Sequence, residues 1–284
     1  MRRCTIPEGP ELAHSRDVLR NSLLNSSVTD ATPTGSGRYS DVHPDGFQRF
    51  LSDVKLGEHL TISSVDTKGK FMWWTMKNAT KTWYMWSTYG MSGQWMKRPS
   101  KHTAFVIESQ KDRQAIQTFF NDPRHFGTLK FVDDERLHLK KLNSLGPCII
   151  TGGLTPEVFT ARILRKQNRR ICEALMDQTA VSGVGNYLRA EILYRARLSP
   201  WRPVVDVTAS EYVDLCKHTI ETADMSYRSN GASISTYRTV DGSKGQTQFD
   251  FEVYGRKNCP QGHSISRMNS DDGRMMWWCE NCQK

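Results

Sequence analysis

The C-terminal end of the chain carries four potential metal ligands in two pairs, and no other feature constrains the fold as strongly. Cys259 and His263 form the first pair, Cys279 and Cys282 form the second, and fifteen residues separate the pairs. Two tight turns that each present two such side chains supply the tetrahedral set that zinc prefers. So small a segment has too little core to fold alone, and zinc would stabilise it. We therefore expect a structural zinc finger; chance spacing or an adventitious disulfide is the alternative.

The remainder of the chain divides into two parts with different patterns. Aromatic and β-branched runs at 64–76, 82–87 and 103–108, broken by Gly, Asn and Asp, predict strands in the first 145 residues. Apolar spacing over 11–24 predicts one opening helix in this part. Helical periodicity then recurs over 158–164, 171–176, 188–193 and 210–227. Thr155, followed by a proline and an acid, predicts the N-cap of the first of these helices.

Composition narrows the classes of protein to which the chain can belong. Its 284 residues give room for two compact domains, and a net charge of +9 favours a partner rich in phosphate, although a basic surface is often indifferent. The apolar runs are too short to span a bilayer, and the basic start MRRCTIPEGPE is not a secretory signal. Seven cysteines, three of them in the finger, fit a reducing compartment and one metal site rather than a disulfide framework.

Two further segments suggest contacts with anions. Gly183-Val184-Gly185-Asn186 lies between two predicted helices, where backbone amides and the Asn186 side chain can bind an anion; an ordinary turn between helices is the alternative. Several arginines and lysines between 162 and 170 favour phosphate, but such a run is often only a solvated face. Arg274 falls near the expected hairpin tip of the finger, either to meet phosphate or as a solvated side chain.

These segments together resemble the formamidopyrimidine-DNA glycosylase and endonuclease VIII (Fpg/Nei) family over nearly the whole chain. The matching motifs, in order, are Pro7-Glu8-Gly9-Pro10-Glu11, Lys68-Gly69-Lys70-Phe71, Tyr89-Gly90-Met91-Ser92-Gly93, Lys101-His102, Asp122-Pro123-Arg124-His125-Phe126-Gly127, Leu175-Met176-Asp177-Gln178, Gly183-Val184-Gly185-Asn186 with Glu191, Val253-Tyr254-Gly255-Arg256, and Arg274 with the last cysteine pair. The Cys-x3-His first pair looks most like the Nei-like 2 branch.

The resemblance implies an α+β fold of three parts. These are an N-terminal β-sandwich catalytic domain over 7–145, a helix-two-turn-helix DNA-binding domain over 155–248, and a C-terminal zinc-finger hairpin over 249–284, with DNA in the cleft between. The segment 239–251, rich in Gly, Lys and Gln, looks like a loop that covers a flipped base.

The resemblance also assigns roles to individual residues. The catalytic positions are Pro7 as nucleophile, Glu8 as general acid, the nearby Glu11, and Lys70, which meets DNA and assists elimination. The implied DNA-binding positions are His102, Arg124, Asn186 and Arg274 on phosphates, and Met91, Arg124 and Phe126 in the gap left by the flipped nucleotide. These roles are those that base excision requires, because the reaction needs an extruded nucleotide, a nucleophilic amine and a group that transfers protons. For a lone Met91 or Phe126, core packing is the alternative.

One feature departs from the family pattern. The family has its proline directly after the initiator methionine, whereas six residues precede Pro7 here. An internal proline nitrogen is an amide and cannot form a Schiff base. Either translation starts later, or the extension is cleaved, or the chain binds DNA without full catalytic activity unless another amine such as Lys70 substitutes.

The resemblance therefore implies a base-excision-repair DNA glycosylase that removes oxidised bases and cleaves the strand by β,δ-elimination as an AP lyase, through a Schiff base on an N-terminal proline. The resemblance to the Nei-like 2 branch implies that these bases are pyrimidines. The alternative is a catalytically impaired protein that binds damaged or single-stranded DNA; a zinc-finger regulator is disfavoured because only one finger is present. The expected cofactor is structural zinc, and the expected partner is damaged DNA, in duplex, single-stranded or bubble form. We expect a monomer in a reducing compartment, the nucleus of a eukaryote or otherwise the cytoplasm.

Overall fold

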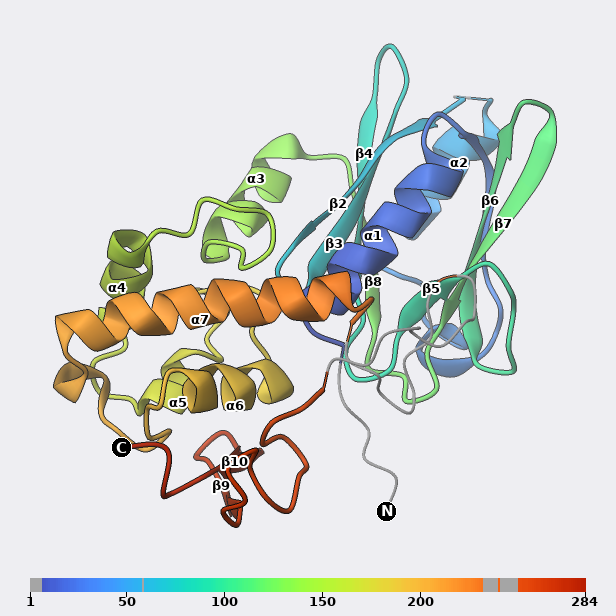
Figure 1. Cartoon of the computed structure of the whole chain (residues 1–284). Coiled ribbons are helices and arrows are strands. Elements are labelled where there is room, and N and C mark those ends of the chain that lie inside the picture. Colours follow the sequence, from blue (N-terminus) through green and yellow to red (C-terminus); the bar gives the residue numbers. More distant parts are fainter. Residues whose placement is uncertain (1–6, 58, 232–239, 241–249) are drawn as a thin grey trace. The chain divides into compact units, whose positions relative to one another are not determined.

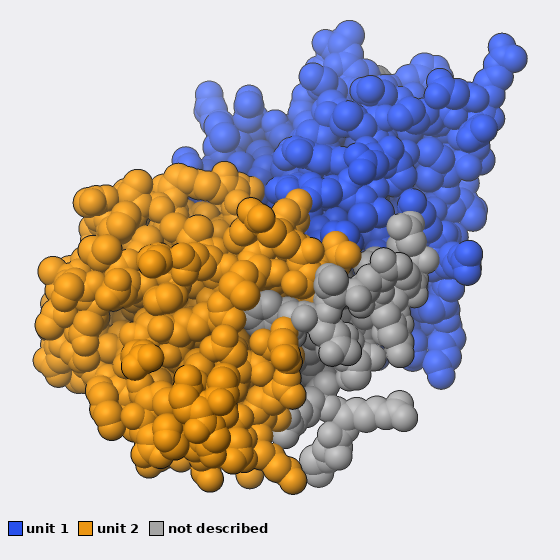
Figure 2. Space-filling view, in the orientation of Figure 1, with its two compact units in different colours: residues 1–7, 12–143, 234–245 blue, residues 8–11, 144–233, 246–284 orange. Residues whose placement is uncertain are grey.

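The computed structural model describes residues 7–57, 59–231, 240 and 250–284. By its contacts the chain divides into two compact units, which Figure 2 colours blue and orange. Unit 1 contains 12–143 together with the short segments 1–7 and 234–245, and unit 2 contains 8–11, 144–233 and 246–284. The predicted covering loop over 239–251 lies almost entirely outside the described residues. Within them, no helix is long and apolar enough to cross a membrane.

Unit 1 is built on one antiparallel sheet that folds into two layers (Figure 1). The strand order is β5-β7-β6-β1-β2-β3-β4-β8. The strands are β1 Ser27–Pro33, β2 Thr61–Lys68, β3 Phe71–Lys77, β4 Thr82–Thr88, β5 Gln94–Met96, β6 Thr103–Lys111, β7 Gln114–Asn121 and β8 Thr128–Val132. β1 and β2 are paired in register only at Ser27 and Thr61, so the sheet can turn sharply there. The result is a sandwich of two four-stranded layers.

Aromatic side chains hold the two layers together. Trp74 of β3 contacts Trp95 of β5, with ring centroids 4.7 Å apart. Phe105 of β6 and Phe131 of β8 lie 5.9 Å apart, again across the layers. Each of these four side chains is almost completely buried. Buried aromatic pairs of this kind supply a large part of the packing free energy of a core.

Three helices accompany the sandwich. They are α1 Gly9–Leu23, α2 Phe47–Lys55 and α3 Glu135–Ser144, with a short 3-10 turn η1 at Gly37–Tyr39. The opening helix was predicted, but α2 and α3 were not. α2 buries Phe47, Phe50 and Val54, a helical spacing hidden among strand-type residues. α3 contains three leucines, but Leu137 and Leu139 are exposed, and His138 is the one buried residue of the helix.

Unit 2 is helical and ends in the finger. Its helices are α4 Pro156–Leu164, α5 Ile171–Ala174, α6 Asn186–Arg195 and α7 Ala209–Arg228, with η2 at Val204–Asp206. Thr155 caps α4 as predicted, since its hydroxyl accepts the Val158 N–H at 3.3 Å. α7 packs against α4 and α6, and residues 187–194 of α6 are all buried. The finger hairpin is β9 Ser266–Asn269 with β10 Met275–Trp278. The predicted fold class is confirmed, whereas the domain boundaries stay a prediction.

The sandwich core generates a stability prediction. Phe50 of α2 is fully buried and stacks on Phe131 at 4.5 Å. Phe50→Ala should lower the free energy of unfolding by about 3–5 kcal/mol, because it removes apolar contacts and leaves a cavity. Leu56, which caps the same helix and is 79% exposed, is the control. Leu56→Ala should change stability by less than about 0.5 kcal/mol in the same denaturant titration. Similar losses in both variants would contradict the assignment of Phe50 to the core.

Candidate functional site

Glu8 lies at the N-terminus of α6, where its carboxylate accepts two backbone hydrogen bonds. Tyr187 donates its N–H to one carboxylate oxygen at 2.9 Å, and Leu188 donates to the other at 3.2 Å. The first N–H groups of a helix have no partner within the helix and bind anionic groups. Glu8 is 1% exposed, and its position is therefore fixed. The anion that the Gly183–Asn186 pattern predicted at these amides is, in this structure, a side chain of the protein itself.

The two glycines of this turn allow the close approach of the Glu8 segment. A Cβ on Gly185 would lie 2.2 Å from the carboxyl carbon of Glu8. The backbone N–H of Gly9 donates to the carbonyl of Gly183 at 2.9 Å, and a Cβ on Gly9 would approach the Gly183 Cα to 3.0 Å. Gly185 therefore cannot be replaced without moving Glu8, and a side chain on Gly9 would force the backbone at Gly183 to shift.

Glu11 supports the same segment from within α1. Its carboxylate accepts the backbone N–H of Glu8 at 2.8 Å, in the manner of a helix capping box. It also accepts the hydroxyl of Tyr187 at 2.9 Å, and that hydroxyl lies 2.9 Å from the Ser226 hydroxyl. Burial, with the negative charge of Glu11 and Glu8, raises the pKa of Tyr187 well above its usual value, so the phenol stays a donor. Glu11 thus orients the residues around Glu8.

Pro7 is buried directly before Glu8, and Lys70 occupies the β2–β3 turn of unit 1, where it is half-buried. Gly69, before Lys70, has a φ of +60°, which a tight turn requires and glycine adopts without strain. The sequence placed Lys70 on a strand, and the structure places it one residue before β3.

In unit 1, hydrogen bonds to Asp122 link the loops that carry Met91, Arg124 and Phe126. Asp122 accepts the Ser92 hydroxyl at 2.8 Å on one oxygen and the Gly127 N–H at 2.6 Å on the other. Phe126 is 52% exposed, and the Arg124 guanidinium lies 5.7 Å from its ring centroid. An aromatic ring this exposed is not a core residue, which removes the packing alternative for Phe126.

His102 belongs to the same neighbourhood, because its carbonyl accepts the Asp122 N–H at 2.8 Å. The structure therefore brings four of the six predicted DNA-binding residues to one set of loops, and Asp122 links them. Asp122 belongs to one of the matching motifs, but no role was predicted for it.

The remaining two predicted DNA-binding residues lie together in unit 2. Asn186 donates its side-chain N–H to the carbonyl of Met275 at 3.1 Å, and Arg274 is the residue before Met275. Arg274 stands at the tip of the finger hairpin as predicted, directly before β10, and its carbonyl accepts the Ser270 N–H at 3.0 Å.

A buried arginine that the sequence analysis did not single out supports this hairpin tip. Arg189 of α6 is 0% exposed and donates to the Ser270 hydroxyl at 2.9 Å and to Asp272 at 3.3 Å. Asp272 also accepts from the Arg274 guanidinium at 3.4 Å. Burial alone would raise the pKa of Asp272, but the Ser270 hydrogen bond and the two arginines lower it, so the carboxylate stays charged. The only sequence signal was an arginine within an otherwise apolar helix face.

The cations upstream of α5 are largely paired within the protein. Lys166 lies 2.8 Å and Arg169 lies 3.5 Å from one oxygen of Asp177. Burial would raise the pKa of Asp177, but hydrogen bonds from Lys166 and Thr179 outweigh it and lower the pKa to about 2. Arg170 lies over the Trp201 ring, 5.3 Å from its centroid. For these side chains the structure favours a structural role.

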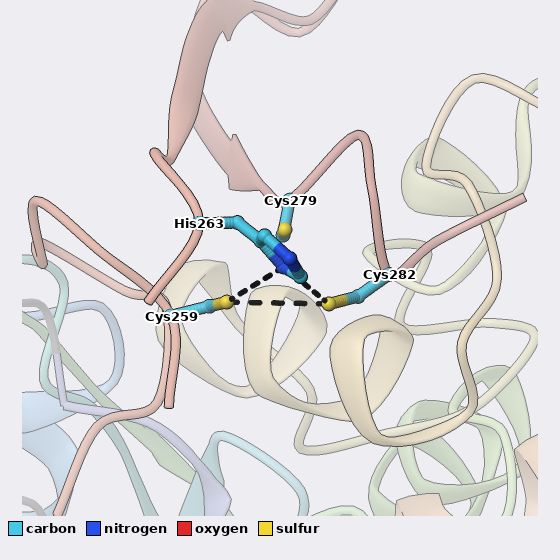
Figure 3. A group of neighbouring side chains, drawn as sticks. All are labelled: Cys259, His263, Cys279 and Cys282. Carbon is cyan, nitrogen blue, oxygen red and sulfur yellow. Dashed lines mark hydrogen bonds between the residues drawn. The ribbon is translucent and has the colours of Figure 1, made fainter. Parts of the chain in front are cut away.

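Cys259, His263, Cys279 and Cys282 gather at one point of the finger, as Figure 3 shows. Their ligand atoms all lie within 4.8 Å of one another. Cys259 Sγ is 4.0 Å from Cys282 Sγ and 3.6 Å from His263 Nδ1. A tetrahedral site with metal–sulfur bonds of about 2.3 Å requires sulfurs about 3.8 Å apart. The four residues therefore fit one metal ion, and four protein ligands leave no open coordination position.

Comparison with known proteins identifies the family. Residues 6–129 match the formamidopyrimidine-DNA glycosylase N-terminal domain, and residues 146–238 match the H2TH domain of the same enzymes. A formamidopyrimidine-DNA glycosylase of Zymomonas mobilis is 30% identical over 69% of this chain and 73% of the relative. That of Desulfitobacterium hafniense is 28% identical over 98% of this chain and 100% of its own length.

Solved structures agree with these matches. The MutM (Fpg) protein of Thermus thermophilus superposes with a TM-score of 0.81 at 28% identity, covering 98% of both chains. Lactococcus lactis Fpg in complex with abasic-site DNA superposes with a TM-score of 0.82 at 23% identity, over 98% of this chain and 99% of that one.

This chain belongs to the Fpg/Nei family of DNA glycosylases. The predicted family is confirmed, and with it the predicted class of enzyme, a bifunctional DNA glycosylase with AP-lyase activity. The relatives named here are formamidopyrimidine-DNA glycosylases, and the Nei-like 2 branch stays a prediction.

The hairpin tip generates a prediction with an internal control. Arg189→Met should lower the free energy of unfolding of the chain by about 3 kcal/mol, because Asp272 and Ser270 lose a buried charged partner. Arg169→Met removes an arginine that also pairs with an aspartate, but its side chain is 52% exposed. This control should cost less than about 1 kcal/mol in the same thermal or denaturant measurement. An equal effect of the two substitutions would show that Arg189 does not hold the tip.

Proposed function

We propose that this chain excises oxidised bases, pyrimidines among them, and then cleaves the strand by β,δ-elimination through a Schiff base on Pro7. The observation that carries the proposal is the position of Glu8. Its carboxylate is fixed by two amides of α6, and it directly follows Pro7 in the chain. A secondary amine beside an immobilised carboxyl group is the pair that this chemistry requires.

The proposed reaction passes through a covalent intermediate on Pro7. The Pro7 nitrogen, once it is a free amine, attacks C1′ of the nucleotide, and the bond from C1′ to the base breaks. The base leaves with a proton, which we assign to Glu8. The sugar ring then opens as the Pro7 nitrogen loses its proton and the ring oxygen O4′ gains one, which leaves an iminium. The iminium draws electrons from C2′, so loss of a C2′ proton expels the 3′ phosphate. Loss of the C4′ proton then expels the 5′ phosphate, and water hydrolyses the remaining imine to restore the amine.

The residues that contact DNA are proposed by the family motif together with their placement. Met91, Arg124 and Phe126 lie on linked loops, and a half-exposed ring beside a guanidinium is suited to fill the gap left by an extruded nucleotide. Asn186 and Arg274, which meet near Met275, are proposed to bind phosphate, as is His102. Lys70 is proposed to contact the strand and to assist elimination.

The nucleophile is tested with two forms of the chain. A chain beginning at Pro7 should form a covalent adduct with an oxidised-pyrimidine duplex in the presence of borohydride. A chain that keeps residues 1–6, verified by intact mass, should form none, because its proline nitrogen is an amide. Should the longer chain form the adduct and the shorter one not, the nucleophile lies elsewhere, and Lys70 becomes the first candidate. Binding to lesion DNA without adduct or nicking in either form would favour the alternative, a non-catalytic damaged-DNA binding protein.

The general acid is tested by Glu8→Gln in the chain that begins at Pro7. Base release should fall by about 100-fold or more, since a positioned acid contributes that much to proton transfer. Affinity for a duplex with an uncleavable abasic analogue should remain within about threefold. Glu157→Gln, which alters an exposed acid of α4, is the matched control and should leave both quantities unchanged. Unaltered base release in Glu8→Gln would assign the proton transfer to another group.

We propose zinc as the metal of the finger, because three thiolates and an imidazole in a closed tetrahedral set suit that ion. The purified chain should contain one equivalent of zinc. Cys279→Ala should lose this zinc and bind lesion DNA at least about tenfold more weakly, since Arg274 is no longer held by a folded hairpin. Cys216→Ala, a buried cysteine of α7 away from the cluster, should keep one equivalent. Full zinc content in Cys279→Ala would exclude this ligand set.

A further inference from the structure

Unit 1 contains a cavity of about 600 Å³ that none of the proposed catalytic or DNA-binding residues lines. We call it the outer pocket, and the residues on which the argument depends are Arg38, Asp45, Phe71, Trp86, Lys130 and Lys141. They come from η1, the segment before α2, the sheet strands β3, β4 and β8, and α3. Its volume lies within the range of pockets that hold small organic ligands.

Two aromatic rings form one wall of the outer pocket. Phe71 and Trp86 meet edge to face, with centroids 5.6 Å apart. The indole N–H of Trp86 donates to His138 of α3 at 3.1 Å, which fixes the orientation of the ring. Burial lowers the pKa of His138, so this ring nitrogen stays available as an acceptor near neutral pH. Trp86 itself is only half-buried, and it is therefore a fixed flat surface accessible to a ligand.

Basic side chains surround these rings. Lys130 Nζ lies 6.0 Å from the Trp86 ring centroid, and Lys141 Nζ lies 5.2 Å from that of Phe71. Arg38 is exposed at the rim. The only acid of the pocket is Asp45, whose carboxylate is 3.2 Å from Lys130. Three cations against one carboxylate make the pocket electropositive and suit an anionic ligand with a flat apolar part.

The outer pocket is continuous with the segments that carry the candidate DNA-binding residues. Phe71 directly follows Lys70. Thr88 and Thr128, which also line the pocket, are paired at the ends of β4 and β8, next to the loops of Met91 and Phe126. A strand that passes these loops therefore has the pocket within reach of its neighbouring nucleotides.

We propose that the outer pocket binds one nucleotide of an unpaired DNA strand beside the lesion, with the base against the half-exposed ring of Trp86 and a phosphate near Lys130 and Lys141. This inference rests on the proposed function and extends it to the form of the substrate, a lesion next to single-stranded DNA. Aromatic stacking and nearby cations are the means by which proteins hold unpaired nucleotides without reading their sequence. In a continuous duplex the base would remain paired, and the pocket would stay empty.

The test measures how much a single-stranded flank adds to binding. The full chain is titrated with a blunt duplex that contains an abasic analogue, and with the same duplex extended by a six-nucleotide single strand on either end. One of the two flanks should tighten binding by at least about fivefold, the gain expected from stacking one base. This gain should fall below about twofold in Trp86→Ala and in the double variant Lys130→Gln/Lys141→Gln. Affinity for the blunt duplex should stay within about twofold in both.

Trp73→Phe is the matched control for the aromatic wall, because it changes a neighbouring indole and keeps a ring against Phe71, 5.8 Å between centroids in this structure. Trp73 lies directly opposite Trp86 on β3 and also contacts His138, 5.4 Å between centroids, but it does not line the pocket. This variant should therefore keep the flank gain. As a readout that needs no variant, a 5-bromouracil in the flank should crosslink on irradiation to the peptide that contains Trp86 or Phe71.

The outcomes separate the two proposals. A chain that does not bind the blunt lesion duplex contradicts the proposed function. If the duplex binds but no flank adds affinity, the outer pocket does not hold a nucleotide. The same conclusion follows if the gain survives in the double lysine variant, or if the crosslinks fall only outside the pocket.

Discussion

The candidate active site depends on one interaction, the carboxylate of Glu8 on the first amides of α6. These N–H groups would otherwise lack partners, and the carboxylate would otherwise be buried without compensation. Both requirements are met at once, because Gly9 and Gly185 carry no side chain that would block the approach of the two segments. The Glu11 carboxylate then accepts a hydrogen bond from the Glu8 backbone N–H and another from the Tyr187 hydroxyl. A short N-terminal motif and a turn more than 170 residues later in the sequence thus form a single structural element.

Much of the architecture could be predicted from the sequence, because it follows from local pattern. The strands of the first half, the capped helix at Thr155 and the finger with Arg274 at its tip all have signals within a few residues. α3 was not predicted, since two of its three leucines are exposed and its one buried residue is a histidine. α2 has such a stripe, but aromatic side chains are typical of strands as well, and only the sandwich core decides between the two.

For the site, the sequence identified the residue types, and the family motif supplied their roles. The partners that orient these residues were not predictable in the same way. Arg189 lies more than 80 residues from Asp272, and three strands separate Asp122 from Ser92 in the sequence. Such pairs arise from tertiary packing, which no local spacing encodes. At the glycine turn, the sequence left a bound anion and an ordinary turn open, and the structure places the carboxylate of Glu8 on these amides.

The layered form of unit 1 has a consequence for the loops at its end. The segment with Met91 joins β4 to β5, and the segment with Phe126 joins β7 to β8, so each passes from one layer of the sandwich to the other. Backbone pairing between the layers is limited to the junction of β1 with β2, and their separation is set mainly by rings such as Trp74 and Trp95. The thickness of the hydrophobic interior therefore determines how far these two connections extend. Natural variation in a residue of this interior can in this way adjust the span of the loops proposed to contact DNA.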